Sequence, residues 1–359
     1  MTLGRTISRH IGWQMAKWIT LIFVIFIFLM MVIDFTQLVR RIGSSLDLQT
    51  ALAIAALRGP ATAESVMPLV VLFAAMAAFF QMNRRLELTV TRAAGVSAWQ
   101  VLIPASVVAM IAGVVVSTVY SPAAAALREL SVSIGGFAGG NAGVLNGGEV
   151  WLRQTGRDGP SIIGAERTAQ QGTVLAGATA FVFDNGGIFR QRIDAELAEL
   201  VDNEWVFERP TVTPTGQAPF VADEYRLHTN LSLVQIRQSL ADPATISMWR
   251  LPDLIAVAEA SSFPANALRL RWHELVSLPL LLAAMVLVAA MFSLRFSRTL
   301  RIGRLIAIGA TTGFALYVVL VVSRNLAANG VVSAPIAAWT PAILALLISV
   351  SVLLREEDG

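Results

Sequence analysis

The sequence contains no cysteine and only one lysine. The absence of cysteine excludes disulfides and thiolate-bound metal sites. The single lysine, Lys17, stands just before an apolar segment and outside any glycine-rich loop. A nucleotide-binding Walker A loop requires lysine between a glycine and a serine or threonine. The chain therefore has no ATP site of this kind. We predict no cofactor of its own, and we expect any ATP-driven work to come from a separate subunit.

Charged residues are also scarce. They make up 14% of the chain, against about a quarter in a typical soluble domain, and 55% of the residues are hydrophobic. This balance places much of the chain in a lipid bilayer. No small-residue cleavage site follows the first apolar run, so we expect that run to remain as a helix. Hydropathy predicts six membrane-spanning helices. They cover residues 18–39, 62–82, 99–119, 275–294, 305–322 and 336–354.

Two prolines interrupt the region of the first two spans. Residues 46–57 carry apolar side chains at helical spacing and are followed by Pro60. We expect a short interfacial helix that stops at this proline, because proline removes a backbone donor. Pro68 falls inside the second predicted span, where we expect a kink.

The placement of basic residues predicts the orientation of the spans, because cytoplasmic loops are enriched in arginine and lysine. With the N-terminus inside the cell, eleven basic residues fall in inner segments and four in short outer loops. Both termini are therefore predicted to be cytoplasmic and the long insert to lie outside the cell membrane. The inner residues are Arg5, Arg9, Lys17, Arg84, Arg85, Arg92, Arg295, Arg298, Arg301, Arg304 and Arg355. The outer residues are Arg40, Arg41, Arg58 and Arg324.

The long insert between the third and fourth spans has a different pattern. Short runs of alternating polarity are separated by turn signals, such as Asn185-Gly186 between two apolar runs, the strongest short-range indication of a hairpin. Several such strands in one stretch favour a β-sandwich or jelly roll. Residues 251–260 resemble a short helix leading back to the membrane. The predicted fold is a six-helix membrane protein with an inserted all-β domain. Its parts are residues 1–120, 121–266 and 267–359.

The sequence offers little that indicates catalysis. His273-Glu274 resembles the start of a zinc-protease motif, but position 277 is serine rather than histidine. His10 and His228 lie in unrelated segments, and zinc sites draw on clustered ligands. We therefore predict no catalytic residue and no metal site.

A basic segment of about residues 84–97 follows the second span. It carries Arg84, Arg85, Glu87 and Arg92, with apolar residues between the charges, and it ends near Gly95. One interpretation is an amphipathic anchor that obeys the positive-inside rule. The other is a helix that docks in a groove of a cytoplasmic partner, with Glu87 facing that partner and Gly95 turning the chain back.

A second set of charges lies near the predicted outer ends of the spans. Arg40 and Arg41 follow the first span, and Arg128 and Arg324 lie near others. Each arginine can reach lipid headgroups as a simple anchor. Together they can converge on an anionic headgroup, because the planar guanidinium binds phosphate in bidentate fashion. Asp34 is an ionisable group near the membrane boundary, with either a functional or a hydrated structural role.

Several short segments, in this order along the chain, resemble the LptF/LptG family, the permeases of the lipopolysaccharide export ABC transporter. The resemblance covers essentially the whole chain. The short acidic tail is more similar to the LptG branch, in its alphaproteobacterial form. The segments are Arg9-His10-Ile11-Gly12, Pro68, Arg85-Leu86-Glu87-Leu88-Thr89-Val90, Ala94-Gly95, Leu278-Pro279-Leu280, Arg295-Phe296 and Gly313-Phe314-Ala315-Leu316-Tyr317.

The resemblance implies an inner-membrane subunit that extracts lipopolysaccharide and has no nucleic-acid partner. The implied partners are an LptF-type permease as heterodimer, two LptB-type ATPases, and LptC/LptA-type jelly-roll bridge proteins. By resemblance, Glu87 and its neighbours form the coupling helix, and Arg40 and Arg41 match a basic pair that faces the substrate phosphates. Asp34 departs from the family, since some members carry a basic residue there, which implies one headgroup contact fewer or a lipid with a different phosphate pattern.

Two other classes of protein remain open. A mechanotransmitting ABC permease usually has four spans with its domain after the first, which disagrees with the span order here. A membrane-anchored sensor with an external β domain would have no stable ATPase partner.

Overall fold

The protein is described by a computed structural model that covers residues 5–42, 47–138, 146–156, 159–169, 173–184, 186–229, 246–260, 265–293 and 302–357. The chain divides into two compact units. The helical unit comprises residues 1–38, 55–128 and 243–359. The sheet unit comprises residues 39–54 and 129–242.

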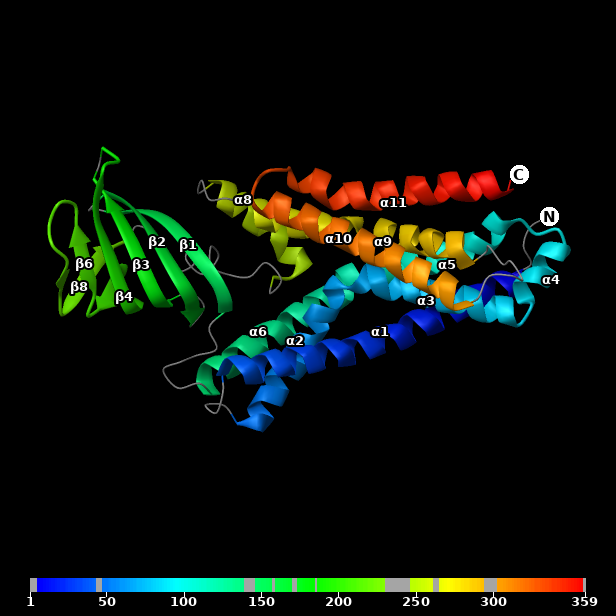
Figure 1. The fold of residues 1–359 in the computed structure, drawn as a ribbon, viewed down its shortest axis with the longest axis horizontal. Helices are drawn as coiled ribbons and strands as arrows, with labels where there is room; N and C mark the ends of the chain where they lie inside the picture. Colours follow the sequence, from blue (N-terminus) through cyan, green and yellow to red (C-terminus); the bar gives the residue numbers. More distant parts are fainter. Residues whose placement is uncertain are drawn as a thin grey trace. The chain divides into compact units, whose positions relative to one another are not determined.

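Within the described residues, six helices are long and apolar enough to cross a membrane. This confirms the predicted number of spans. In the helical unit, α1 begins and α11 ends at the end where α4 lies, here named the α4 end (Figure 1). The opposite end, where α8 lies, is named the α8 end. The helices are α1 (Arg5–Ile42), α2 (Leu48–Ser65), α3 (Met67–Arg84), α4 (Glu87–Ala93), α5 (Ala98–Val115), η2 (Val116–Tyr120), α6 (Ser121–Ala138), η5 (Met248–Arg250), α8 (Leu251–Ala260), α9 (Asn266–Ser293), α10 (Ile302–Ala328) and α11 (Ala334–Glu357).

Helix α2 does not stop at Pro60, and the prediction of a stop there was wrong. The helix continues to Ser65. Proline removes one backbone donor and so leaves only the carbonyl four residues earlier, that of Ala56, without its helical partner. The turn at Pro60 is held from outside the helix, since the Tyr120 hydroxyl donates a hydrogen bond to the carbonyl of Pro60 (2.8 Å). The break falls one turn later, where α3 begins with Pro68 in its first turn.

Helices α5, η2 and α6 form one continuous helix from Ala98 to Ala138. The first 18 residues of the predicted insert are thus helical rather than part of the β-rich region. Their run of alanines explains this, because alanine has the highest helix propensity. Pro122 lies just after the π-helical turn η2. Proline cannot donate to the carbonyl of Thr118, which accepts a hydrogen bond from the Trp249 indole instead (3.3 Å).

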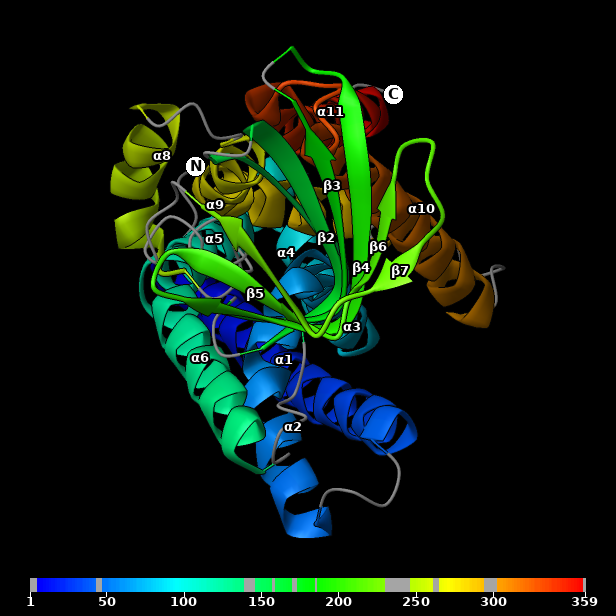
Figure 2. The same cartoon turned by 90° about the vertical axis from the view of Figure 1, so that its left-hand side faces the viewer.

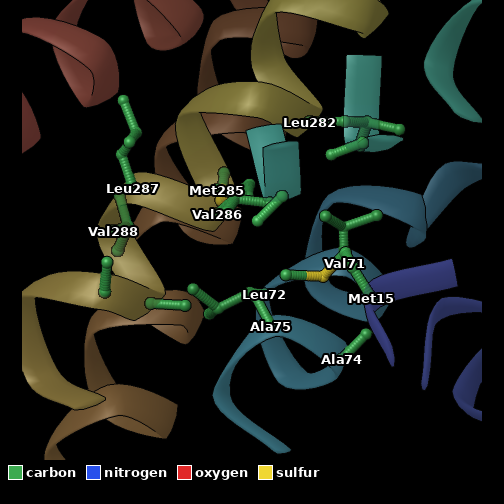
Figure 3. Close-up of a cluster of buried hydrophobic side chains, with 14 of the residues drawn as sticks. Met15, Val71, Leu72, Ala74, Ala75, Leu282, Met285, Val286, Leu287 and Val288 are labelled. Atoms are coloured by element: carbon green, nitrogen blue, oxygen red, sulfur yellow. The ribbon is translucent and has the colours of Figure 1, made fainter. Parts of the chain in front are cut away.

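Helix α9 lies at the centre of the helical unit and packs against α3, α5 and α11. Leu282, Met285 and Val286 of α9 belong to one apolar cluster with side chains of α3, and in Figure 3 Met15 of α1 lies beside Val71. Small residues bring the helices close. A Cβ atom on Gly113 of α5 would lie 2.5 Å from the Cα atom of Pro279 in α9. Such small-residue crossings are typical of membrane helix pairs, since they allow backbones to approach.

The sheet unit contains an antiparallel sheet in the strand order β1-β2-β3-β4-β5-β8. β4 is long enough to pair with β5 through residues 197–201 and with β6 through residues 191–194. Figure 2 shows the sheet strongly curved. This confirms an antiparallel β-sheet region between the third and fourth spans, consistent with a jelly-roll-like domain. The strands are β1 (Asn146–Gly156), β2 (Gly159–Ala169), β3 (Val174–Phe183), β4 (Phe189–Val201), β5 (Glu204–Glu208), β6 (Thr211–Pro214), β7 (Phe220–Val221) and β8 (Glu224–His228).

The predicted hairpin signals have a clear structural origin. Between β3 and β4, the Asp184 carboxylate accepts hydrogen bonds from the backbone N–H groups of Gly186 (2.9 Å) and Ile188 (2.8 Å). Between β4 and β5, Asp202 and Asn203 both adopt positive φ angles, as a two-residue hairpin turn requires. The curved sheet encloses an apolar core. Its fully buried side chains include Ile163, Ile193, Trp205, Phe207 and Leu227.

Candidate functional site

Helix α4 is short, and a residue with a positive φ angle lies near each of its ends. Leu86, at its N-cap, is left-handed with φ 59°, and Gly95 beyond its end has φ +82°. Ser97 then caps α5 in a capping box with Gln100. The predicted helical segment of about residues 84–97 is therefore one helix of seven residues between two turns. The predicted turn at Gly95 is confirmed.

The surface of α4 combines charge with exposed apolar side chains. Leu88 is buried and attaches the helix to the helical unit, whereas Leu86 is 58% exposed and Val90 is 67% exposed. Arg84, Arg85 and Arg92 are also exposed. An exposed apolar surface with a basic border is typical of a docking site for a partner.

Glu87 is held by a residue that sequence reasoning did not single out for this role. Its carboxylate lies 3.1 Å from Nε2 of His10 on α1, and Arg85 approaches the other carboxylate oxygen at 3.9 Å. Further along α1, the Trp18 indole donates a hydrogen bond to the Gln81 side chain of α3 (2.9 Å). Helix α1 is thus in polar contact with α4 through His10 and with α3 through Trp18. Nothing in the spacing of these residues along the sequence indicated them.

The arginines predicted to contact a headgroup fall in both units. Arg40 is exposed, and the side chain of Arg41 lies outside the described residues. Both belong to the sheet unit, whereas Arg128 and Arg324 belong to the helical unit. Arg128 is half-buried, and Arg324 pairs with Glu274. Their convergence at one site stays a prediction.

Asp34 of α1 has a partner in the helical unit. Its carboxylate accepts a hydrogen bond of 2.9 Å from the hydroxyl of Thr62 on α2. Nearby, a Cβ atom on Gly59 of α2 would lie 3.3 Å from Cβ of Met31 on α1, an approach closer than most side chains make. These contacts give Asp34 a structural connection between α1 and α2.

Sequence reasoning missed a cluster of charges near the α8 end of the helical unit. Arg271 of α9 donates a hydrogen bond of 2.7 Å to Glu64 of α2 and one of 3.2 Å to the hydroxyl of Ser121. The two charged side chains are 17% and 5% exposed, respectively. Ionisable groups within apolar segments often have a function. This rule would have indicated both Arg271 and Glu64 from the sequence.

A second ion pair lies one helical turn away. Nε of Arg324 on α10 lies 2.6 Å from a carboxylate oxygen of Glu274 on α9. The approach is not a well-directed hydrogen bond, since neither atom has a hydrogen-bond partner within the described residues. Between the two pairs is a cavity of about 30 Å³, which Ser277 and Leu278 also line. This volume suits a water molecule and is far too small for a lipid chain.

The described residues contain no group of three or more histidines and acidic residues placed to hold a metal ion. The charges described at the α8 end are paired, and several of those at the α4 end are exposed. This arrangement can bind and hold partners or anions.

Comparison with known protein families decides the family. Residues 9–355 match the family model described as lipopolysaccharide export system permease LptF/LptG. The chain belongs to the LptF/LptG family. The match extends across both units, so the six helices and the inserted sheet are together the LptF/LptG architecture. No curated protein matches the sequence at a significant level.

Membership of the LptF/LptG family defines the general role of the chain. The family comprises inner-membrane permease components of the lipopolysaccharide export ABC transporter, which work with the other components of that system. A mechanotransmitting permease or a sensor is correspondingly disfavoured.

Proposed function

We propose that this chain extracts lipopolysaccharide from the outer leaflet of the inner membrane and passes it to a periplasmic bridge. ATP hydrolysis in a separate cytoplasmic subunit drives the extraction. The observation that carries the proposal is the family match across residues 9–355, which joins six apolar helices to an inserted antiparallel sheet.

The free-energy cost of removing acyl chains from a bilayer explains why extraction needs an energy source. Moving an acyl chain from a bilayer into water costs about 0.8 kcal/mol per methylene, so a chain of about ten methylenes costs roughly 8 kcal/mol. Lipopolysaccharide carries several acyl chains and an anionic headgroup. Extraction therefore requires both an apolar path and external work. In this proposal the sheet unit is the part of the chain that receives the lipid next.

The proposal assigns a side of the membrane to each end of the helical unit. The α4 end and both termini are cytoplasmic, and the sheet unit is periplasmic. The distribution of basic residues supports this orientation. The chain is the LptG-type subunit and pairs with an LptF-type permease over two LptB-type ATPases. It delivers lipid to LptC/LptA-type jelly-roll proteins.

Two groups of residues carry the proposed roles. α4 and its flanks couple ATP hydrolysis to the helices, with Arg84, Arg85, Glu87, Arg92 and Gly95 as the coupling residues. The exposed surface of α4 supports this role. A second group contacts the lipid headgroup, and its members are Arg40, Arg41, Arg128 and Arg324, with Asp34 beside them.

Co-purification from detergent tests the proposal. The chain is expressed in its native cells, where its partner proteins are also present. Bound proteins and lipids are then identified by mass spectrometry. The expected result is a complex with a second permease, an ABC ATPase and lipopolysaccharide. Purification without an ATPase or lipopolysaccharide contradicts the proposal and favours a membrane-anchored sensor.

The role of α4 is tested by Glu87→Lys in the same complex. The charge reversal places a cation beside His10 and Arg85, so we expect α4 to lose its docked geometry and ATP-dependent lipid release to fall at least tenfold. Glu259→Lys, which reverses an exposed carboxylate beside Arg269, far from α4, is the matched control for charge reversal. Unchanged lipid release by the Glu87 variant removes this residue from the coupling role.

A further inference from the structure

Two ion pairs on α9 connect the helix to different neighbours near the α8 end. Arg271 and Glu274 are three residues apart and lie on the same side of the helix. Arg271 pairs with Glu64 of α2, and Glu274 pairs with Arg324 of α10. One cavity touches all four side chains. The two pairs therefore share an environment and differ in which helix they hold.

The Glu64–Arg271 pair has the properties of a permanent connection. Glu64 is 5% exposed, and Arg271 also donates to Ser121, which is itself buried. Removing one member of such a pair leaves an uncompensated buried charge, which costs several kcal/mol. No anion from the surroundings can reach Arg271 without first displacing Glu64 from a buried site.

The side chains of the Glu274–Arg324 pair are more exposed than those of the Glu64–Arg271 pair. The Nε–H groups of Arg271 and Arg324 both lack a hydrogen-bond acceptor within the described residues. The two arginines differ in exposure: the Arg324 side chain is 34% exposed, twice the exposure of Arg271, so a partner from outside can reach it. A guanidinium binds best with two parallel hydrogen bonds to one anion. Arg324 therefore retains capacity for a better partner than Glu274 and is accessible to one.

Helix α10 is otherwise attached lightly. Only 17% of its most apolar window is buried, against 72% for α9. Gly309 and Gly313 pack against Met76 and Leu72 of α3 in the half of α10 toward the α4 end. Beyond Arg324, the small side chain of Ala327 lies in an apolar cluster with Leu270 of α9 and three alanines of α11. Near the α8 end, α9 and α10 are thus connected by the ion pair and by this small apolar contact.

We propose that Glu274 and Arg324 form a latch that a phosphate monoester opens. The phosphate replaces Glu274 as the partner of Arg324, and the end of α10 then separates from α9. The inference rests on the proposed function, since the phosphate is that of the extracted lipid. A phosphate monoester has up to two negative charges and three acceptor oxygens, so it competes well with a single carboxylate for a guanidinium.

The latch distinguishes lipids with a phosphate monoester from the other lipids of the same membrane. Opening it leaves the Glu274 carboxylate, 16% exposed, without its counter-ion. Water in the adjoining cavity offsets this cost only in part, because the cavity has room for little more than one molecule. A phosphodiester lipid with one charge gains less from Arg324 than a monoester and does not open the latch.

The absence of cysteine from the chain makes the movement of α10 directly measurable. Spin labels are attached at Leu326→Cys on α10 and Val115→Cys on α5, both exposed positions, in the full complex with cysteine-free partners. The probes are diphosphorylated lipid A, dephosphorylated lipid A and phosphatidylglycerol. Pulsed electron paramagnetic resonance is expected to show a shift to longer distances with diphosphorylated lipid A alone. An equal shift with all three lipids overturns the filter.

Variants separate the latch from a merely structural ion pair. Glu274→Gln is expected to give the long distance without lipid. Arg192→Gln, which breaks the pair with Asp194 in the sheet unit, is a control expected to leave the distance unchanged. The double variant Glu274→Arg/Arg324→Glu restores the pair with its charges exchanged. It is expected to keep the short distance and to lose the response to lipid A. A double variant that still responds overturns the proposal, as does Glu274→Gln with the wild-type distance.

The lipid retained by the wild-type complex is identified in the same samples by mass spectrometry. Retained lipid A without a change in distance overturns the latch and leaves the proposed function intact. A complex that retains no lipopolysaccharide or lipid A overturns both.

Discussion

Helices α1 and α9 are both among the most apolar segments of the chain, yet they occupy opposite environments. In the most apolar window of α9, 72% of the residues are buried within the chain, against 6% for α1. The difference follows from side-chain size. Residues 281–290 of α9 include four alanines, whereas residues 20–33 of α1 contain neither alanine nor glycine. Small residues let backbones approach, and bulky ones cover a surface that faces lipid or a partner.

Hydropathy therefore places a helix in the membrane but does not say where it lies in a bundle. The polar contacts follow the same division. α9 carries ion pairs to α2, α10 and α8, while α1 is attached mainly through buried residues near its start and single hydrogen bonds. Helix α9 is held on several sides by its neighbours, whereas the exposed side of α1 can contact lipid or another chain.

The largest expected effect comes from breaking the central ion pair. Glu64→Ala leaves Arg271 buried without its counter-ion and should destabilise the chain by about 3–5 kcal/mol. Glu259→Ala breaks the exposed pair with Arg269, and the expected change is about 0–1 kcal/mol. Denaturant titration in detergent micelles measures both. Equal effects would show that burial does not distinguish these pairs.

A pair of truncations compares the centre with the edge directly. Leu282→Ala on α9 removes a fully buried side chain and should cost about 2–5 kcal/mol. Ile25→Ala on α1 alters a side chain that is 54% exposed, so the isolated chain should unfold at nearly the wild-type denaturant concentration. A large loss of stability for Ile25→Ala would show that α1 packs within the helical unit.

The α5–α9 crossing gives a third comparison. Gly113→Ala places a Cβ atom against the backbone of Pro279, which cannot move aside as a side chain can, and should cost about 1–3 kcal/mol. Gly12→Ala meets only a methyl group of Val108, at 3.3 Å, and is the matched control. Thermal unfolding in detergent checks the difference. Wild-type stability of the Gly113 variant contradicts the close crossing.

The smallest expected effect is at the attachment of α1. Trp18→Phe removes the hydrogen bond to Gln81 and should cost about 1 kcal/mol. Trp13→Phe changes a side chain that is 70% exposed and should leave stability unchanged. Tryptophan fluorescence during unfolding measures each variant. Indistinguishable unfolding curves would remove Trp18 from the attachment of α1.

Much of the fold followed from elementary patterns in the sequence. Long apolar runs predicted the six spans, and turn residues predicted the hairpins of the sheet. The short helix at residues 251–260 was also predicted at the bounds that α8 has. Each of these features depends on residues close together in the sequence. The same local reasoning failed at Pro60, where the helix continues and contacts Tyr120, 60 residues away in the sequence.

The site was harder to predict for the same reason. The turn at Gly95 follows from glycine's tolerance of positive φ, which sequence reasoning can use. The partners of Glu87 and Arg324 come from other helices, and hydropathy averages conceal single charges such as Glu64 and Glu274. Scanning every apolar segment for isolated charges would have found the cluster, although not its pairing.

Lipid transfer in a reconstituted system tests the central claim most directly. The chain is placed in proteoliposomes with its partner permease, its ATPase and lipopolysaccharide, and a soluble periplasmic jelly-roll protein carrying a photo-crosslinker is added. The account predicts crosslinking to lipopolysaccharide that requires ATP and is lost when this chain is omitted. Crosslinking that proceeds equally without ATP, or without this chain, would contradict it.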